Sequence, residues 1–248
     1  MVALTLTLQT AVAALRLAFG VLALRTAAKR GDSPRAEAWY MAGVTFTLVG
    51  AVALVHSLAG IAAQLNPGTP FYDVFLDLIP PGNDARSVLV LGFTLALAWV
   101  LLLERPWPSR RLVVRGAVAL LVAGFLIGFL EPPVEQHQAG DHLTVMSVLG
   151  AATAICLFAA LYRGLVRGQI DWLLWTALAL YAVEQALSSN IQTVLAWAGF
   201  GGAWAPPVSS IMWVGLVAVL AMVACALRRL VIARAGGDVP GLMERLRG

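Results

Sequence analysis

Ionisable side chains inside apolar stretches are the groups of this chain best suited to chemistry. Arg16, His56 and Glu184 each interrupt a long apolar run. A charge removed from water costs several kcal/mol unless a partner neutralises it, so each of these side chains needs a partner or a function. A helical rise of about 1.5 Å per residue places Arg16 roughly 14 Å and Glu184 roughly 20 Å from the basic ends of their segments. We therefore expect an Arg16–Glu184 ion pair, which is either a structural link or part of a ligand or proton site.

A polar stripe accompanies Glu184 along one face of its segment. At about 100° per residue, one sector holds the side chains of Tyr181, Glu184, Gln185, Ser188 and Gln192. Such a stripe should face protein or water rather than lipid. Polar side chains of other segments fall at similar depth, and together they predict a cavity that opens outward and binds a small ligand. The predicted ligand-binding residues are Gln9, Arg16, His56, Tyr181, Glu184, Gln185, Ser188, Gln192 and Ser209.

The elements that must position these groups are membrane-spanning helices. The 248 residues are 60% hydrophobic and 12% charged, whereas soluble domains carry about 25% charged residues. Most apolar segments approach the length of about 20 residues that a helix needs to cross a bilayer. Their continuous Ala- and Leu-rich runs disfavour the alternating strands of a β-barrel. We predict an all-α integral membrane protein, a seven-helix bundle with transmembrane helices at 2–24, 38–63, 87–103, 112–130, 143–162, 172–198 and 207–227.

The chain is predicted to form one transmembrane domain, residues 1–234, followed by a short cytoplasmic tail, residues 235–248. The tail is too small to be a kinase, cyclase or other output domain, so we expect any cytoplasmic effector to be a separate chain. The apolar segment 71–80 predicts a short helix that lies flat on the outer surface. The spacing of Gly124 and Gly128 lets two helices approach closely in lipid, either within the bundle or in a homodimer.

Basic residues are concentrated in alternate loops, which predicts the orientation of the chain. The basic loops carry Arg25, Lys29, Arg30, Arg35, Arg105, Arg110, Arg111, Arg115, Arg163, Arg167, Arg228, Arg229 and Arg234, whereas Arg86 is the only basic residue of the other loops. The positive-inside rule then places the N-terminus outside and the C-terminus in the cytoplasm. We expect a multi-pass protein of the bacterial cytoplasmic (inner) membrane, with Trp39, Trp107 and Trp172 as anchors near the inner boundary. This distribution explains the basic charge without a nucleic-acid partner.

A weak metal-site pattern lies between the fourth and fifth predicted helices. The candidate ligands there are Glu135, His137, Asp141 and His142. Imidazole and carboxylate groups can hold Zn²⁺, but the spacing of these residues matches no zinc signature. A polar loop of this composition is the more common interpretation.

Several cofactors and reactions are disfavoured by the residues present. The topology is that of microbial rhodopsins, but Lys29 is the only lysine and lies in a predicted loop, so a retinal Schiff base on the seventh helix is excluded. His56 is the only histidine inside a predicted helix, which argues against a bis-His haem. No hydrolase, protease or nucleotide-binding motif is present, so the chain is expected not to be an enzyme. Bound lipid or pigment between the helices remains compatible with the sequence.

Three hypotheses for function follow from these patterns. The first is a receptor-like or sensory membrane protein, which binds a small ligand or lipid head group from outside and signals through a separate protein partner. The second is an accessory structural subunit of a larger, energy-converting membrane complex. The third is a small-solute or proton-coupled transporter using Glu184, although the chain lacks the internal repeats typical of transporters.

Overall fold

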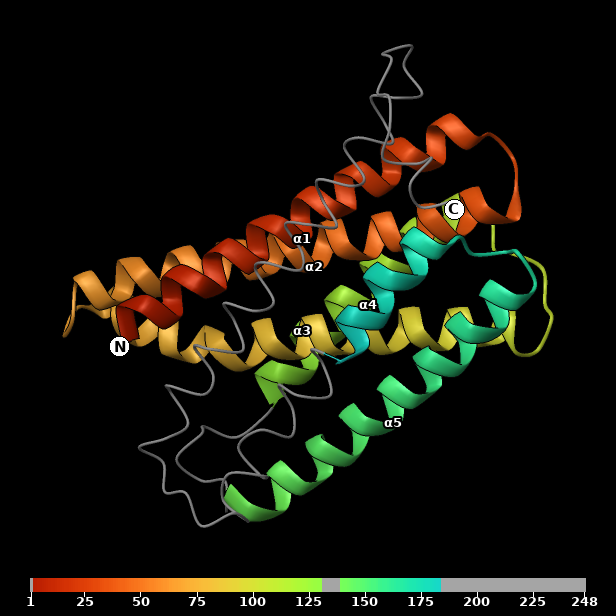
Figure 1. Cartoon of the computed structure of the whole chain (residues 1–248). Helices are drawn as coiled ribbons and strands as arrows, with labels where there is room; N and C mark the ends of the chain where they lie inside the picture. The colour runs from red at the N-terminus through yellow and green to blue at the C-terminus, as the bar shows by residue number, and fades with distance from the viewer. Residues whose placement is uncertain (1, 131–138, 184–248) are drawn as a thin grey trace.

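The computed structural model describes residues 2–130 and 139–183, and these residues form a bundle of long helices (Figure 1). The labelled helices are α1 (Val2–Arg30), α2 (Pro34–Leu65), α3 (Pro70–Leu101), α4 (Arg110–Leu130) and α5 (Ala139–Val166). A further helical stretch, helix Trp172–Val183, follows α5. No strand occurs among the described residues, so the predicted all-α fold is confirmed for this part of the chain.

The described residues contain five helices that are long and apolar enough to cross a membrane. They correspond to the first five predicted spans, and helix Trp172–Val183 corresponds to the start of the sixth. The chain is thus a multi-pass membrane protein. The predicted seventh helix, 207–227, lies outside the described residues, and the count of seven stays a prediction.

Helices α1 and α2 pack as a close antiparallel pair through small residues. On α1, Ala13, Gly20 and Ala27 recur every seven residues and are all buried. On α2, Gly43, Gly50 and Ser57 repeat with the same spacing and are also buried. Hydrophobic association between helices is weak in lipid, so small residues that let backbones approach supply the packing energy. Arg16 belongs to the buried stripe of α1, which is why this pairing carries the charge into the bundle.

Capping residues explain where α2 and α3 begin. The side chains of Ser33 and Thr69 accept hydrogen bonds from the backbone N–H groups of Ala36 and Tyr72, and a proline follows each cap. The cap and the proline are both signals of a helix start. The capping oxygen accepts a hydrogen bond from a backbone N–H group that has no partner within the helix, and proline has no N–H group that would need one. The observed helices therefore extend beyond the apolar windows, which mark only the part suited to hydrocarbon.

The prediction of a separate surface helix at 71–80 is wrong. This segment forms the first turns of α3, which continues through Pro80 and Pro81. Prolines normally interrupt a helix, but this helix continues past them. The residues directly after the prolines make close contacts with other helices. A Cβ atom on Gly82 would lie 2.9 Å from Nδ1 of His56, and Ala85 packs against Gly124 of α4. These contacts pack the residues after the two prolines against α2 and α4, within the same continuous helix.

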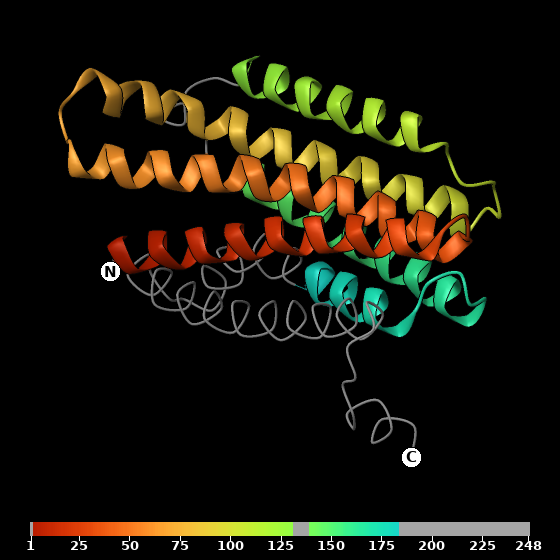
Figure 2. The same ribbon diagram turned by 90° about the horizontal axis from the view of Figure 1, so that it is seen from above.

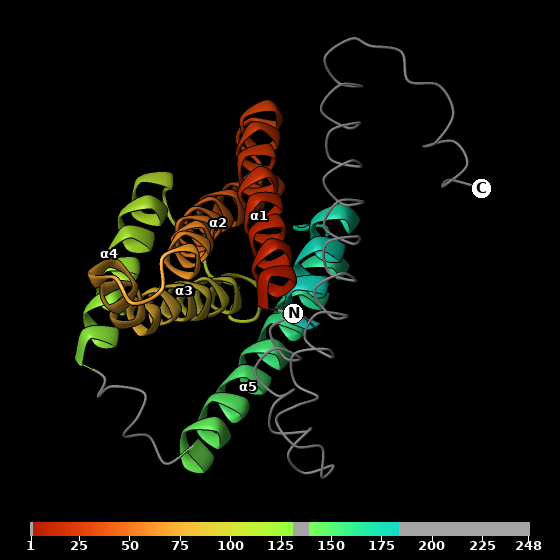
Figure 3. The same ribbon diagram turned by 90° about the vertical axis from the view of Figure 1, so that its left-hand side faces the viewer.

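Helix α4 lies at the periphery of the described bundle. Seen down the bundle, α4 and α1 lie on opposite sides of α2 (Figure 3). The buried residues of α4 are Ala117, Gly124 and Gly128, and its other large side chains are mostly exposed. A Cβ atom on Gly124 would lie only 2.5 Å from Cα of Ala85. This glycine is used for packing within the bundle, the first of the two interpretations of the glycine pair.

Candidate functional site

The centre of the candidate site is Arg16, a charged side chain in the middle of α1. It is 5% exposed, and Tyr181, which its guanidinium faces, belongs to the hydrophobic core of the bundle. Its guanidinium carbon lies 5.5 Å from the centroid of the Tyr181 ring, within the range of a cation–π interaction. Tyr181 comes from helix Trp172–Val183 and is 3% exposed. The fold thus brings together two predicted site residues that are 165 positions apart in the sequence.

Aromatic rings hold this pair in place. Phe46 of α2 meets Tyr181 edge-on at 4.7 Å between ring centroids, and Phe19 meets Phe46 in the same way at 4.9 Å. Edge-to-face contacts of this kind contribute about 0.5–1.5 kcal/mol beyond the burial of the rings. The guanidinium of Arg16 therefore rests on a ring that is itself packed against α2, and this set of contacts connects three helices. A cation buried away from water attracts an anion more strongly than the same group in water.

The remaining predicted site residues are placed only in part. Gln9 is half-buried on α1, seven residues and therefore about 10 Å from Arg16 along the helix. In the register set by the pairs Gly20–Thr47 and Gly50–Leu17, residue 10 lies level with residue 57. The predicted first, second and sixth helices are therefore neighbours. The site residues that lie outside the described residues are Glu184, Gln185, Ser188, Gln192 and Ser209.

His56 belongs to a second polar cluster, between α2 and α3. Its ring lies 5.3 Å from that of Phe75 and directly beside Gly82. Arg86, one turn further along α3, donates hydrogen bonds to the carbonyl of Gly82 and to the side chain of Asn83. His56 therefore packs against α3, a helix that did not enter the predicted cavity.

The opposite end of the bundle carries an ion-pair network that joins the basic loops. The loops 31–33, 102–109 and 167–171 all lie at this end, far from the N-terminus (Figures 1 and 2). Asp171 joins three parts of this network. One carboxylate oxygen accepts hydrogen bonds from Arg30 and from Nε1 of Trp39, the latter at 2.8 Å. The other accepts the backbone N–H of Leu174 at 3.0 Å and so caps helix Trp172–Val183.

Two further acidic residues extend this network. Glu37 pairs with Arg110 at 2.9 Å and thereby links α2 to the start of α4. Glu104 accepts hydrogen bonds from Arg167 and, at 3.3 Å, from Arg163, which links the α3–α4 loop to the end of α5. The hydrogen bonds from Arg167 and Arg163 lower the pKa of the Glu104 carboxyl below its ordinary value. Arg35 completes the connections by donating to the carbonyl of Gly168 at 2.7 Å.

Sequence reasoning missed the role of Asp171 and did not predict the burial of Trp39. Trp39 was expected to anchor the chain at the membrane boundary, but its side chain is 0% exposed and donates to Asp171. A tryptophan can serve as a buried donor as well as an interfacial anchor, and the sequence does not distinguish the two roles. The signal for Asp171 was available, because an aspartate directly before an apolar run is a common N-cap.

The predicted metal site receives no support from the described residues. Within them no group of three or more His, Cys, Asp or Glu side chains is arranged to hold a metal ion. Asp141 and His142 lie at the start of α5, and Glu135 and His137 lie outside the described residues. The interior Arg16–Tyr181 pair, which joins two predicted ligand-binding residues, is the candidate site. Comparison with known protein families, curated proteins and solved structures finds no match to this chain.

Proposed function

We propose that this protein is a receptor-like or sensory membrane protein whose polar interior site binds a small anionic ligand or a lipid head group. The observation that carries the proposal is the burial of Arg16 among three helices, with its guanidinium against Tyr181. Charged groups inside membrane helices are costly, so each is by default a candidate functional site. Glu184 would be the resident counter-ion, because it follows Tyr181 by three residues, one turn of a helix.

The sixth helix gives such a site a route to the other end of the bundle. Tyr181 contacts Arg16, and ten residues earlier Asp171 begins the same helix inside the ion-pair network. The two residues are therefore about 15 Å apart along one rigid element. A ligand that competes with Tyr181 or Glu184 for Arg16 would shift this helix and alter the contacts of Asp171. A separate effector protein at the basic end would detect that change.

The basic end would face the cytoplasm of a bacterial cell, with the N-terminus outside. In the described residues, the arginines of three loops gather at one end, and Arg86 is the only basic residue near the other. This charge asymmetry supports the orientation through the positive-inside rule. Cysteines introduced at Gly68 and Asp32, in a background without Cys156 and Cys225, test it. A membrane-impermeant thiol reagent should label residue 68 but not residue 32 in intact cells.

Native mass spectrometry of gently extracted protein tests the receptor proposal. The wild-type chain should carry a bound small molecule that Arg16→Gln loses, while Arg25→Gln, an exposed charge change on the same helix, retains it. If neither protein carries a small molecule and Arg16→Gln folds as well as wild type, Arg16 has no binding role.

A second candidate is an accessory subunit of a larger membrane complex. The exposed apolar side chains of α4, among them Val118, Val122 and Leu126, would then contact another subunit. The same extraction experiment distinguishes the candidates, because a subunit is purified with fixed partner chains and a receptor is purified alone.

Transport is a third candidate. Proton-linked uptake into vesicles that Glu184→Gln abolishes would favour it over both.

A further inference from the structure

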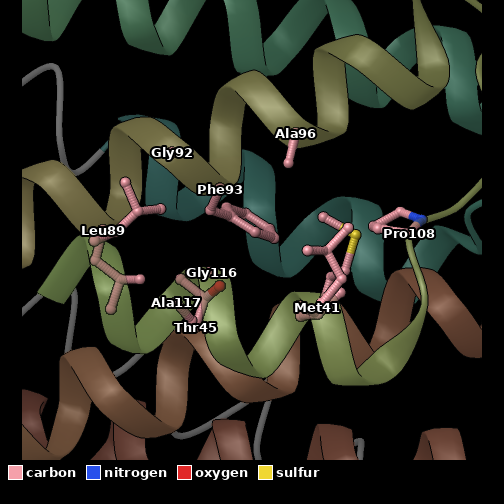
Figure 4. A pocket seen from close by; sticks show the side chains of 12 residues that line it. Met41, Thr45, Leu89, Gly92, Phe93, Ala96, Pro108, Gly116 and Ala117 are labelled. Carbon is pink, nitrogen blue, oxygen red and sulfur yellow. The ribbon is translucent and has the colours of Figure 1, made fainter.

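An apolar groove lies between α2, α3 and α4, away from Arg16 (Figure 4). Its volume is about 210 Å³, and its walls include Met41, Leu89, Phe93 and Gly116. Thr45 is the only polar side chain among the lining residues, and it is buried. The groove is smaller than the ~300–1,000 Å³ of sites for drug-sized ligands. A narrow hydrocarbon chain fits this shape and chemistry better than a polar solute.

The groove has the position expected of a lipid chain in one leaflet. It begins beside Pro108, at the basic end of the bundle, and extends along α4 to Leu120. The ten residues from Arg110 to Leu120 span about 15 Å, half of the ~30 Å hydrocarbon thickness. Leu112, which lines the groove, is 60% exposed. The groove therefore opens sideways, at the periphery of the described bundle.

Two arginines lie on α4 beside Leu112, at one edge of the groove. Arg111 and Arg115 are one turn apart, and they lie about 100° and 60° around the helix from Leu112, on the side away from Gly116 and Ala117. Both are exposed. Neither forms a hydrogen bond or ion pair with any residue that the structure describes, unlike Arg110, which is held by Glu37. These two charges are therefore available to a phosphate group at the membrane surface.

We propose that the groove binds one acyl chain of an anionic phospholipid, whose phosphate pairs with Arg111 and Arg115. The apolar lining selects a hydrocarbon chain, and the two arginines select an acidic head group. Long basic side chains near the end of a span reach the interface readily. The site is separate from the Arg16 site, so the proposal stands or fails independently of the proposed function.

Gly116→Leu is the variant that fills the groove. A Cβ atom on Gly116 meets nothing within 4 Å, whereas one on Gly92 would lie 2.2 Å from a methyl group of Leu120. Leucine at 116 therefore enters open space and also favours the helix, so the variant should fold. Ala119→Leu, an exposed change on the same helix outside the groove, is the matched control.

The experiment titrates purified, delipidated full-length protein with phosphatidylglycerol or phosphatidylcholine and counts bound lipid by native mass spectrometry. Wild type and Ala119→Leu should bind one phosphatidylglycerol in preference to phosphatidylcholine, and Gly116→Leu should lose this binding. Arg111→Gln and Arg115→Gln should each reduce the preference about fivefold, while Arg25→Gln leaves it unchanged. Equal binding of the two lipids by wild type, undiminished binding by Gly116→Leu, or a second protein chain in place of lipid would overturn the proposal.

Discussion

The guanidinium carbon of Arg16 lies 5.5 Å from the centroid of the Tyr181 ring, and both side chains are buried. The first residue comes from α1 and the second from helix Trp172–Val183, so the contact joins the two ends of the described chain. Phe46 of α2 packs on the same ring. The Arg16–Tyr181 contact and the packing of Phe46 on the same ring therefore connect three helices. The proposed function depends on the Arg16–Tyr181 contact.

Arg16→Gln should destabilise the protein by about 3–5 kcal/mol, because it leaves the proposed counter-ion Glu184 buried without a partner. Arg16→Gln combined with Glu184→Gln should recover much of this loss, since no charge is then left unpaired. The free energy of unfolding in detergent, measured for both single variants and the double variant, gives the coupling. Additive effects of the two changes would show that the side chains do not interact.

Tyr181→Leu should cost about 0.5–2 kcal/mol more than Tyr181→Phe, because only the phenylalanine ring keeps the cation–π contact with Arg16. The same unfolding measurement checks this order. In the Arg16→Gln background the difference between the two Tyr181 variants should shrink. A difference of unchanged size there would mean that packing of the ring, rather than the cation, accounts for the effect.

Gly50→Ala should destabilise the α1–α2 pair by about 1–3 kcal/mol through overpacking. A Cβ atom at residue 50 would lie 2.4 Å from the backbone nitrogen of Leu17, and backbone cannot move aside as a flexible side chain can. Gly116→Ala is the control, since its Cβ meets nothing within 4 Å. In detergent, the melting temperature of Gly50→Ala should therefore be lower than that of Gly116→Ala, although the chemical change is the same. Equal melting temperatures would contradict the close approach of α1 and α2.

Asp171→Ala should be about 1 kcal/mol more destabilising than Asp171→Asn, because asparagine retains the N-cap of the sixth helix. Both variants lose the ion pair with Arg30. Because the asparagine variant keeps the cap, its loss of stability measures the contribution of the ion pair alone. Asp32→Asn serves as the control, since its side chain is fully exposed and lies 3.8 Å from Arg110. Exposed pairs of this kind contribute little, so the control should unfold as wild type does.

The stability of the basic end should fall in acid because of Glu104. Its pKa is lower in the folded protein than its ordinary value of 4.5, owing to hydrogen bonds from Arg167 and Arg163. The contribution is therefore fully present above pH 4.5 and is lost as the pH falls through the folded-state pKa. Glu104→Gln should flatten this part of the stability–pH profile. Added salt should weaken the effect, since the group is exposed.

The sequence by itself determined the class and much of the layout of this protein. Hydrocarbon accepts only backbones whose polar groups are bonded internally, so long apolar runs can be read as spanning helices without knowledge of their neighbours. The same physics made Arg16 a candidate site residue, since a charge at that depth is costly wherever the helix packs. The alternation of basic loops likewise anticipated that their arginines gather at one end of the bundle.

Only the tertiary structure decided which helices touch. Depth along a helix follows from residue count, but the direction of a side chain around the bundle depends on packing partners distant in sequence. This is why Tyr181 and Arg16 could be predicted to belong to one site, whereas the packing of His56 against α3 could not be predicted. The burial of Trp39 was not predicted, and the prediction of a separate 71–80 helix was wrong, for the same reason. Their environments are set by Asp171 and by contacts of Gly82 and Ala85, which no local pattern encodes.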